Sequence, residues 1–357
     1  MSAGDVVRRM AAGAIALAAV VLVAPLACER GDGRTPLTVY SPHGKELLRH
    51  YELAFERDNP TVDVQWVDMG SQEVLERIQA EAANPQADVW FGAPADAFDR
   101  AGRQGLLAAY RPSWAARVPP EARGDGDLWY GTYLTPEVIA YNTDRIAAAD
   151  APRDWDDVLL PRWKGQVVIR DPVASGSMRA IFGGVLLRSI QETGDTRAGW
   201  RWLERLDGQT REYAFNPALL YEKLKRGEGL ITLYNMPDIA TLRQRTGAPV
   251  TYVLPTSGTP VLVDAIAVLR GARQPALARR FYEFVTTPEA LRFAADSLMR
   301  IPARTDLPPD QLPAWMREAT SEVRAMPLDR RMLQDSLDVW MRRWETRVRN
   351  RYRTAGR

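Results

Sequence analysis

Three stretches of the sequence place small polar residues between an apolar run and an amphipathic helix. The clearest is Ser175-Gly176-Ser177 within "RDPVASGSMRAIFGGVLLRSI", residues 170–190. The backbone N–H groups of a helix's first turn are unpaired and lie at the positive end of its dipole, so hydroxyl groups there favour an anion. The alternative is a plain N-cap, in which the serine only satisfies its own helix. The same arrangement occurs at two other places: Ser41, His43 and Gly44, and then Gly70, Ser71 and Gln72.

Sequence patterns of catalysis are weak. The serine stretch lacks the Gly-x-Ser-x-Gly pattern of hydrolases, and no lysine follows Ser175 or Ser177 by three residues. No Gly-Lys-Ser or Gly-Lys-Thr phosphate loop occurs, and the only histidines, His43 and His50, form no metal-ligand pattern. We therefore expect a chain that binds a ligand without converting it, with no cofactor and no metal. An exported hydrolase of phosphate esters stays open as an alternative.

The elements that must position these residues alternate between strand and helix. Strand patterns at 37–40, 61–68 and 87–92 are separated by helical patterns at 45–58 and 71–83. After a segment rich in Gly, Pro and Arg, the order resumes with strands predicted at 138–143, 165–172, 229–235, 250–255 and 263–271. This order is typical of α/β folds, in which ligands bind beyond the carboxyl ends of the strands. The three polar stretches are thus expected to converge on one cleft.

The break between the two series of strands predicts two lobes. The first lobe is expected to comprise residues 37–133 and 263–357, and the second residues 134–262. The crossings would be "GTYLTPEV" and "GTPVLVDA", whose Gly-Thr pairs suit hinges. The basic end of the chain keeps an apolar stripe that predicts a helix packed on the body, with a membrane-surface helix as the alternative. The stripe consists of Leu333, Leu337, Trp340, Trp344 and Val348.

Charge and the N-terminus indicate where the protein works. The chain has 357 residues and a formal net charge of +2, which does not suit a nucleic-acid-binding surface. Arg8 and Arg9 precede an apolar run that stops at Cys28, the only cysteine, so residues 1–27 are predicted to be a signal peptide. "PLAC" resembles a bacterial lipobox, which implies lipidation of Cys28 and a tether over 28–36. The alternative is a single membrane-spanning anchor.

The order of motifs resembles a known family. "LTVYSPHGKE", "AFERDNPTVDVQWVDMGSQEVLERIQAEAANPQADVWFGAP" and the lone exported cysteine together resemble the family 1 extracellular solute-binding proteins of ABC importers. The resemblance is greatest to the branch that binds ferric ion, hexose phosphates and phosphonates. It implies a two-lobed α/β fold of the type II periplasmic-binding-protein kind, whose cleft closes on its ligand by hinge motion.

The resemblance also implies particular site residues. Ferric-ion binders hold a phosphate through a Gln, a Ser-Gly pair and an Asn, which Gln72, Ser175-Gly176-Ser177 and Asn216 match. Their metal is held by a His, an acidic residue and two adjacent tyrosines. Here His43 is retained, whereas Ser71 and Asn235 replace the acidic residue and one tyrosine, and Tyr234 remains. Fe(III) needs hard anionic oxygens, so the anion half of the site is better preserved than the metal half.

These observations lead to one hypothesis with alternatives. The chain is predicted to be a monomeric, lipid-anchored periplasmic protein that delivers a small phosphate- or phosphonate-containing organic anion to an ABC permease. The anion would lie against the helix starts, while Asn235 and Asp238 bind the organic part and Tyr234 forms a wall or packs. Ferric iron or an iron chelate is the alternative ligand, and a sensor that passes the ligand to a membrane receptor is an alternative role.

Overall fold

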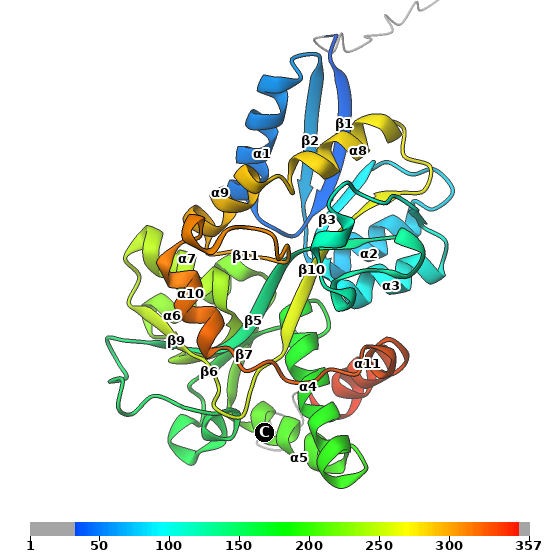
Figure 1. Cartoon of the computed structure of the whole chain (residues 1–357). Coiled ribbons are helices and arrows are strands. Elements are labelled where there is room, and N and C mark those ends of the chain that lie inside the picture. Colours follow the sequence, from blue (N-terminus) through cyan, green and yellow to red (C-terminus); the bar gives the residue numbers. More distant parts are fainter. Residues whose placement is uncertain (1–32, 350–357) are drawn as a thin grey trace, which may run out of the picture. The chain divides into compact units, whose positions relative to one another are not determined.

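A computed structural model describes residues 33–349. The long strands and most of the helices lie where the sequence predicts them (Figure 1). The strands are β1 (Thr35–Ser41), β2 (Val62–Asp68), β3 (Val89–Pro94), β4 (Leu107–Ala108), β5 (Tyr130–Asn142), β6 (Val167–Arg170), β7 (Thr210–Ala214), β8 (Ile231–Asn235), β9 (Val250–Val253), β10 (Val261–Leu269) and β11 (Ile301–Pro302). The sequence patterns did not predict β4, β7 and β11.

One long strand joins the two halves of the sheet. The order is β2-β1-β3-β10-β5-β8-β6-β7, and β5 pairs with β10 in its first part and with β8 and β9 in its second. Figure 1 shows β5 and β10 running side by side through the middle. We call the half around β1–β3 and β10 the first lobe and the half around β6–β8 the second. The two predicted crossings therefore lie in or next to neighbouring antiparallel strands.

Each lobe has its own apolar core. In the first lobe, α1 buries Leu47, Leu48, Tyr51 and Phe55 at helical spacing against the sheet. In the second, α4 is buried on most sides, so its sequence is apolar almost throughout. The α-helices are α1 (Lys45–Asp58), α2 (Ser71–Ala80), α3 (Ala95–Arg103), α4 (Gly176–Thr193), α5 (Arg197–Gln209), α6 (Pro217–Arg226), α7 (Met236–Thr246), α8 (Pro275–Phe284), α9 (Pro288–Leu298), α10 (Ala314–Glu322) and α11 (Arg330–Arg343).

The end of the chain packs differently from its predicted lobe. The stripe on α11 is buried as expected, but Leu333, Leu337 and Trp344 join the core of the second lobe with Phe182 of α4. Because Gly183 of α4 has no side chain, Leu333 can approach the helix closely. The predicted assignment of all residues after 263 to the first lobe is therefore wrong for α11. The other lobe boundaries stay a prediction.

Polar contacts also tie α11 to the first lobe. Asp99 of α3 accepts hydrogen bonds from Arg330, with Nε···Oδ2 at 2.6 Å, and from Gln334. Asp338 of α11 pairs with Arg100 of α3 at 2.9 Å and with Arg179 of α4. The helix thus contacts both lobes. The predicted signal peptide, Cys28 and most of the tether lie outside the described residues, and no helix over 33–349 is long and apolar enough to cross a membrane.

Candidate functional site

A cavity of about 860 Å³ lies between the two lobes. Its walls are formed by the first turns of α1 and α2 from the first lobe and of α4, α6 and α7 from the second. Further lining comes from the ends of strands β2, β3, β6 and β8, from β5 and β10, and from the end of α9 with the residues that follow it. The parallel strands β1 and β6 each lead towards this cavity through their carboxyl ends, as expected for an open α/β sheet.

The helix starts in the two lobes are capped in different ways. In the second lobe the side chains of Ser175, Asn216 and Asn235 accept hydrogen bonds from their own helices, at 3.4, 2.8 and 2.9 Å. In the first lobe the N-cap residues are Gly44 and Gly70, which have no side chain. Five positive helix ends therefore border one cavity, which favours a negatively charged ligand.

Most of the predicted site residues line this cavity, and two do not. His43, Gly44, Ser71, Ser175, Gly176, Ser177, Asn216, Tyr234, Asn235 and Asp238 all belong to its lining. Ser41 is fully buried, and its hydroxyl accepts a hydrogen bond from the backbone of His43 at 3.2 Å. Gln72 is buried on α2 outside the lining. The side-chain oxygens of Ser175, Asn216 and Asn235 cap their own helices. A ligand would therefore contact the free backbone N–H groups of these helix starts rather than those oxygens.

His43 packs into the first lobe. Its ring makes edge contacts with Phe91 and Tyr133, at centroid distances of 4.6 and 5.4 Å. A Cβ at Gly92 would lie 2.6 Å from Nε2, so glycine is required beside this ring. Burial, aided by the charge of Arg300, lowers the pKa of His43 well below its ordinary value, so the imidazole is neutral.

Three arginines that the sequence patterns did not identify lie in the cavity lining, and two of them, Arg170 and Arg300, are largely buried. Arg170, at the end of β6, donates to the carbonyl oxygens of Ala214 and Phe215 at 3.2 and 3.1 Å and is only 5% exposed. Its place at the carboxyl end of a buried strand was a signal that could have identified it. Arg300 follows α9 and pairs with Asp238 of α7 across the cleft, with 3.0 Å between Nη2 and Oδ1. No local motif marks Arg300 as a site residue.

Two tyrosines and two carboxylates complete the inner part of the cleft. Tyr221, which the sequence patterns also missed, donates to Asp238 at 2.9 Å and lies edge-on to Tyr234, with 6.1 Å between ring centroids. Burial is the main cause that raises the pKa of both phenols. Asp264 of β10 accepts a hydrogen bond from Thr135 at 2.6 Å. No group of three or more His, Cys, Asp or Glu side chains within 33–349 is arranged to hold a metal ion.

Comparison with known proteins agrees with this architecture. Residues 84–323 match the family described as "Bacterial extracellular solute-binding protein". The chain is 28% identical over 297 residues to a Sinorhizobium fredii protein named as a probable ABC transporter periplasmic-binding protein, y4fP, covering 82% of this chain and 81% of that protein. It is 25% identical over 276 residues to iron uptake protein A2 of Synechocystis, covering 73% and 78%.

A solved structure shows the same fold. The periplasmic binding protein AfuA of Actinobacillus pleuropneumoniae, with exogenous fructose-6-phosphate bound, superposes with a TM-score of 0.76 at 23% identity, covering 89% of this chain and 99% of that chain. The fold is therefore the type II periplasmic-binding-protein fold, with a mixed α/β sheet in two lobes. With its family match, cleft and lobes taken together, the chain belongs to the bacterial extracellular solute-binding proteins, whose named relatives include ABC transporter binding proteins.

Proposed function

We propose that this protein captures a small organic phosphate or phosphonate in its cleft and delivers it to an ABC permease. The observation that carries the proposal is the environment of Arg170. Its guanidinium group is buried in the cleft wall and binds only two backbone carbonyls, and no described carboxylate lies within ion-pair distance of it. A buried charge without a counter-charge is costly, so an anionic ligand group would stabilise this wall.

The surroundings of Arg170 favour a phosphoryl group in particular. The first turns of α4 and α6 border the same cavity, and backbone N–H groups at helix starts bind phosphate oxygens. Arginine binds a phosphate through two parallel N–H donors, and the hydroxyl of Ser177 lies in the same lining. A cavity of about 860 Å³ is large for an inorganic anion alone, which supports an organic substituent.

The ferric-iron alternative is less well supported by the side chains. Tyr221 and Tyr234 are the phenols that could bind iron, and burial raises the pKa of both, which disfavours the tyrosinate that Fe(III) needs. His43 is packed against Phe91 and Tyr133. We therefore place iron second, although one relative is named an iron uptake protein.

A binding role is also favoured over hydrolysis. The hydroxyl of Ser175 accepts a hydrogen bond from the backbone of Met178 and caps α4. Asn235 approaches Ser177 with its amide nitrogen at 3.5 Å, and an amide is no general base. Glu137 also lies beside Ser177, but burial raises the pKa of this carboxyl group well above its ordinary value, which favours the protonated form that cannot accept a proton. These contacts suit donors to an anion rather than an activated nucleophile.

Titration calorimetry tests this proposal. The protein would be stripped of co-purified ligand by partial unfolding and refolding, and then titrated with ethyl phosphate, phosphoethanolamine, fructose 6-phosphate and methylphosphonate. Binding of at least one of these, with none for the matching alcohols, is expected. Tight binding of ferric citrate with no response to any phosphoryl compound would contradict the proposal.

The cellular setting forms part of the same proposal. We infer a monomer attached to the membrane by a lipid on Cys28, with residues 1–27 removed and lobes bounded near residues 134 and 262. Incorporation of radiolabelled palmitate that is lost in Cys28→Ser would support the anchor, and equal labelling of both proteins would refute it. Genes for a permease and an ATPase beside this one would favour an importer over a sensor.

A further inference from the structure

The two walls of the cleft carry opposite charge. The second-lobe wall contributes Arg170, Arg245 and Asp238, which together leave one excess positive charge. The first-lobe wall contributes more carboxylates than cations, namely Glu46, Asp68, Glu73 and Asp264 against Lys45 and Arg300. A ligand with a negative charge alone would complement the side-chain charges of the second-lobe wall and not those of the first.

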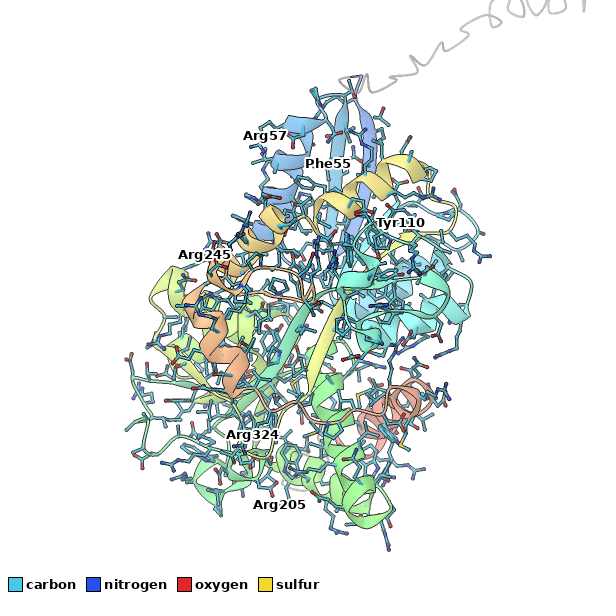
Figure 2. All side chains as sticks on the ribbon, viewed as in Figure 1. Phe55, Arg57, Tyr110, Arg205, Arg245 and Arg324 are labelled. Atoms are coloured by element: carbon cyan, nitrogen blue, oxygen red, sulfur yellow. The ribbon has the colours of Figure 1, made fainter. Side chains whose placement is uncertain are left out.

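One ion pair at the rim already joins the walls. Arg245, at the end of α7, pairs with Glu46 of α1 at 2.5 Å, and both side chains are about half exposed. Figure 2 labels Arg245, whose helix belongs to the second lobe. Solvent screens such a pair, so it changes the charge balance of the inner cleft little.

In the inner cleft, where the paired strands β5 and β10 pass between the lobes, carboxylates outnumber positively charged side chains. Arg300 forms an ion pair with Asp238 at 3.0 Å, and its positive charge also acts to lower the pKa of Asp264. Glu137 of β5 is fully buried near the same two aspartates, and Ser177 is the one described residue whose side chain comes near enough to donate a hydrogen bond to it. Arg300 is therefore the one positive charge that acts on both aspartates, while Glu137 lies beside them without a cation among the groups that shift its pKa.

Burial is the main influence on the protonation of these carboxylates. Burial raises the pKa of Glu137 well above its ordinary value, and the two aspartates add to the shift while Ser177 opposes it. Burial also raises the pKa of Asp264, against the effects of Arg300 and Thr135. His43 supplies no charge here because its pKa is lowered. Even when Glu137 is not counted, the formal charges of Asp238 and Asp264 exceed that of Arg300 by one, and a cationic ligand group beside Asp264 would offset the burial that raises its pKa.

We propose that the ligand is a zwitterion whose phosphoryl group binds Arg170 and whose protonated amine binds Asp264 on the opposite wall. This inference rests on the proposed function, because it takes the phosphoryl site as given. Asp264 is 8% exposed, lines the cavity and receives only one hydroxyl hydrogen bond at Oδ2, so it has room for an ammonium donor. A ligand of this kind neutralises both walls and bridges the lobes when the cleft closes.

A pair of probes that differ only in the amine tests the inference. Wild-type protein is expected to bind phosphoethanolamine about tenfold or more tightly than ethyl phosphate, since a charge-assisted contact is lost in the second compound. In Asp264→Asn the two affinities should become equal within about threefold, with that for ethyl phosphate little changed. Asp296→Asn, which removes an exposed carboxylate of α9 outside the cavity lining, should keep the preference and is the matched control.

The outcomes separate the two proposals. If neither probe nor any other phosphoryl compound binds, the proposed function fails. If both probes bind wild-type protein equally, or if the preference survives in Asp264→Asn, the zwitterion inference fails while the phosphoryl site stands. Thermal unfolding of each variant without ligand shows whether it is folded, and the wild-type comparison decides the matter even if Asp264→Asn is not.

Discussion

Replacing Gly176 by alanine should prevent the two lobes from closing fully over the cleft. Gly176 begins α4 in the second lobe and directly faces the first lobe. A Cβ placed on it would lie 2.8 Å from Cγ of Pro94, 3.0 Å from Cδ of the same ring and 3.3 Å from Oγ of Ser71. Ordinary contact begins at 3.4 Å, so the nearest pair is too close by about 0.6 Å. The lobes must then separate, or the Pro94 ring must shift.

The size of the effect follows from the steric cost. Inserting a methyl group into a packed contact costs about 1–3 kcal/mol. If that cost falls on the closed state alone, the affinity for the ligand drops by about 5–150-fold. Calorimetry with the tightest-binding phosphoryl probe measures the drop, and small-angle scattering with saturating probe should show a larger radius of gyration than for the wild-type protein.

A matched substitution in the same helix controls for general damage to the fold. Gly183 of α4 also lacks room for a side chain, because its Cβ would lie 2.7 Å from Cδ2 of Leu333. That contact lies between α4 and α11 and does not line the cleft. Gly183→Ala should therefore lower the unfolding temperature without lowering the affinity. Wild-type affinity in Gly176→Ala, or an equal loss in Gly183→Ala, would refute the closing contact.

Three further substitutions test other parts of the account. Arg170→Gln should lower the affinity for every phosphoryl probe by about thirtyfold or more, because a charged hydrogen bond is worth about 2 kcal/mol or more. Arg245→Gln, at the exposed rim, should change the affinity by less than about threefold. Similar losses of affinity for the two variants in calorimetry would count against a role for Arg170. Glu137→Gln should stabilise the protein increasingly above pH 4.5, by up to about 1.4 kcal/mol per pH unit. The reason is that the pKa of Glu137 is raised by folding, so that above this pH the unfolded chain releases a proton that the folded protein keeps. Urea unfolding at pH 4 and pH 7 should show the gain in stability only at the higher pH, and a gain at both would be inconsistent with a titration effect. Leu337→Ala should cost about 2–5 kcal/mol in urea unfolding because it leaves a cavity beneath α11, whereas Val339→Ala, at a position 54% exposed, should cost under about 0.5 kcal/mol; equal costs would mean that α11 is not part of the core.

Much of the fold was predictable from sequence because it depends on local patterns. Apolar periodicity predicts α1 and α4. The near-continuous apolar run from Val89 predicts a strand that is buried on both faces. Strand β7 was missed because "TREYA" has two adjacent charged residues and no apolar alternation, and only its first and last residues are buried. The position of α11 was missed because it depends on Gly183 in a distant helix, which no local pattern connects to the end of the chain.

The candidate site divides in the same way. The helix starts at Gly44, Ser71 and Ser175 were recognisable because small polar residues before an apolar helix are a local signal. Their side chains were assigned too directly, since several cap their own helices. Arg300 pairs with Asp238 and comes near Asp264 only because the turn after α9, β10 and α7 meet in the folded protein. This arrangement is therefore a property of the tertiary structure alone.

The most direct test of the central claim is to identify the molecule that the cleft carries. The protein would be purified from its native host without refolding and examined by native mass spectrometry, and its ligand would then be released by denaturation for phosphorus NMR. Our account predicts an added small-molecule mass and one organic phosphoryl signal per protein, both absent from Arg170→Gln prepared in the same way. A bound ligand without phosphorus, or an iron-loaded protein that retains its cargo in Arg170→Gln, would contradict it.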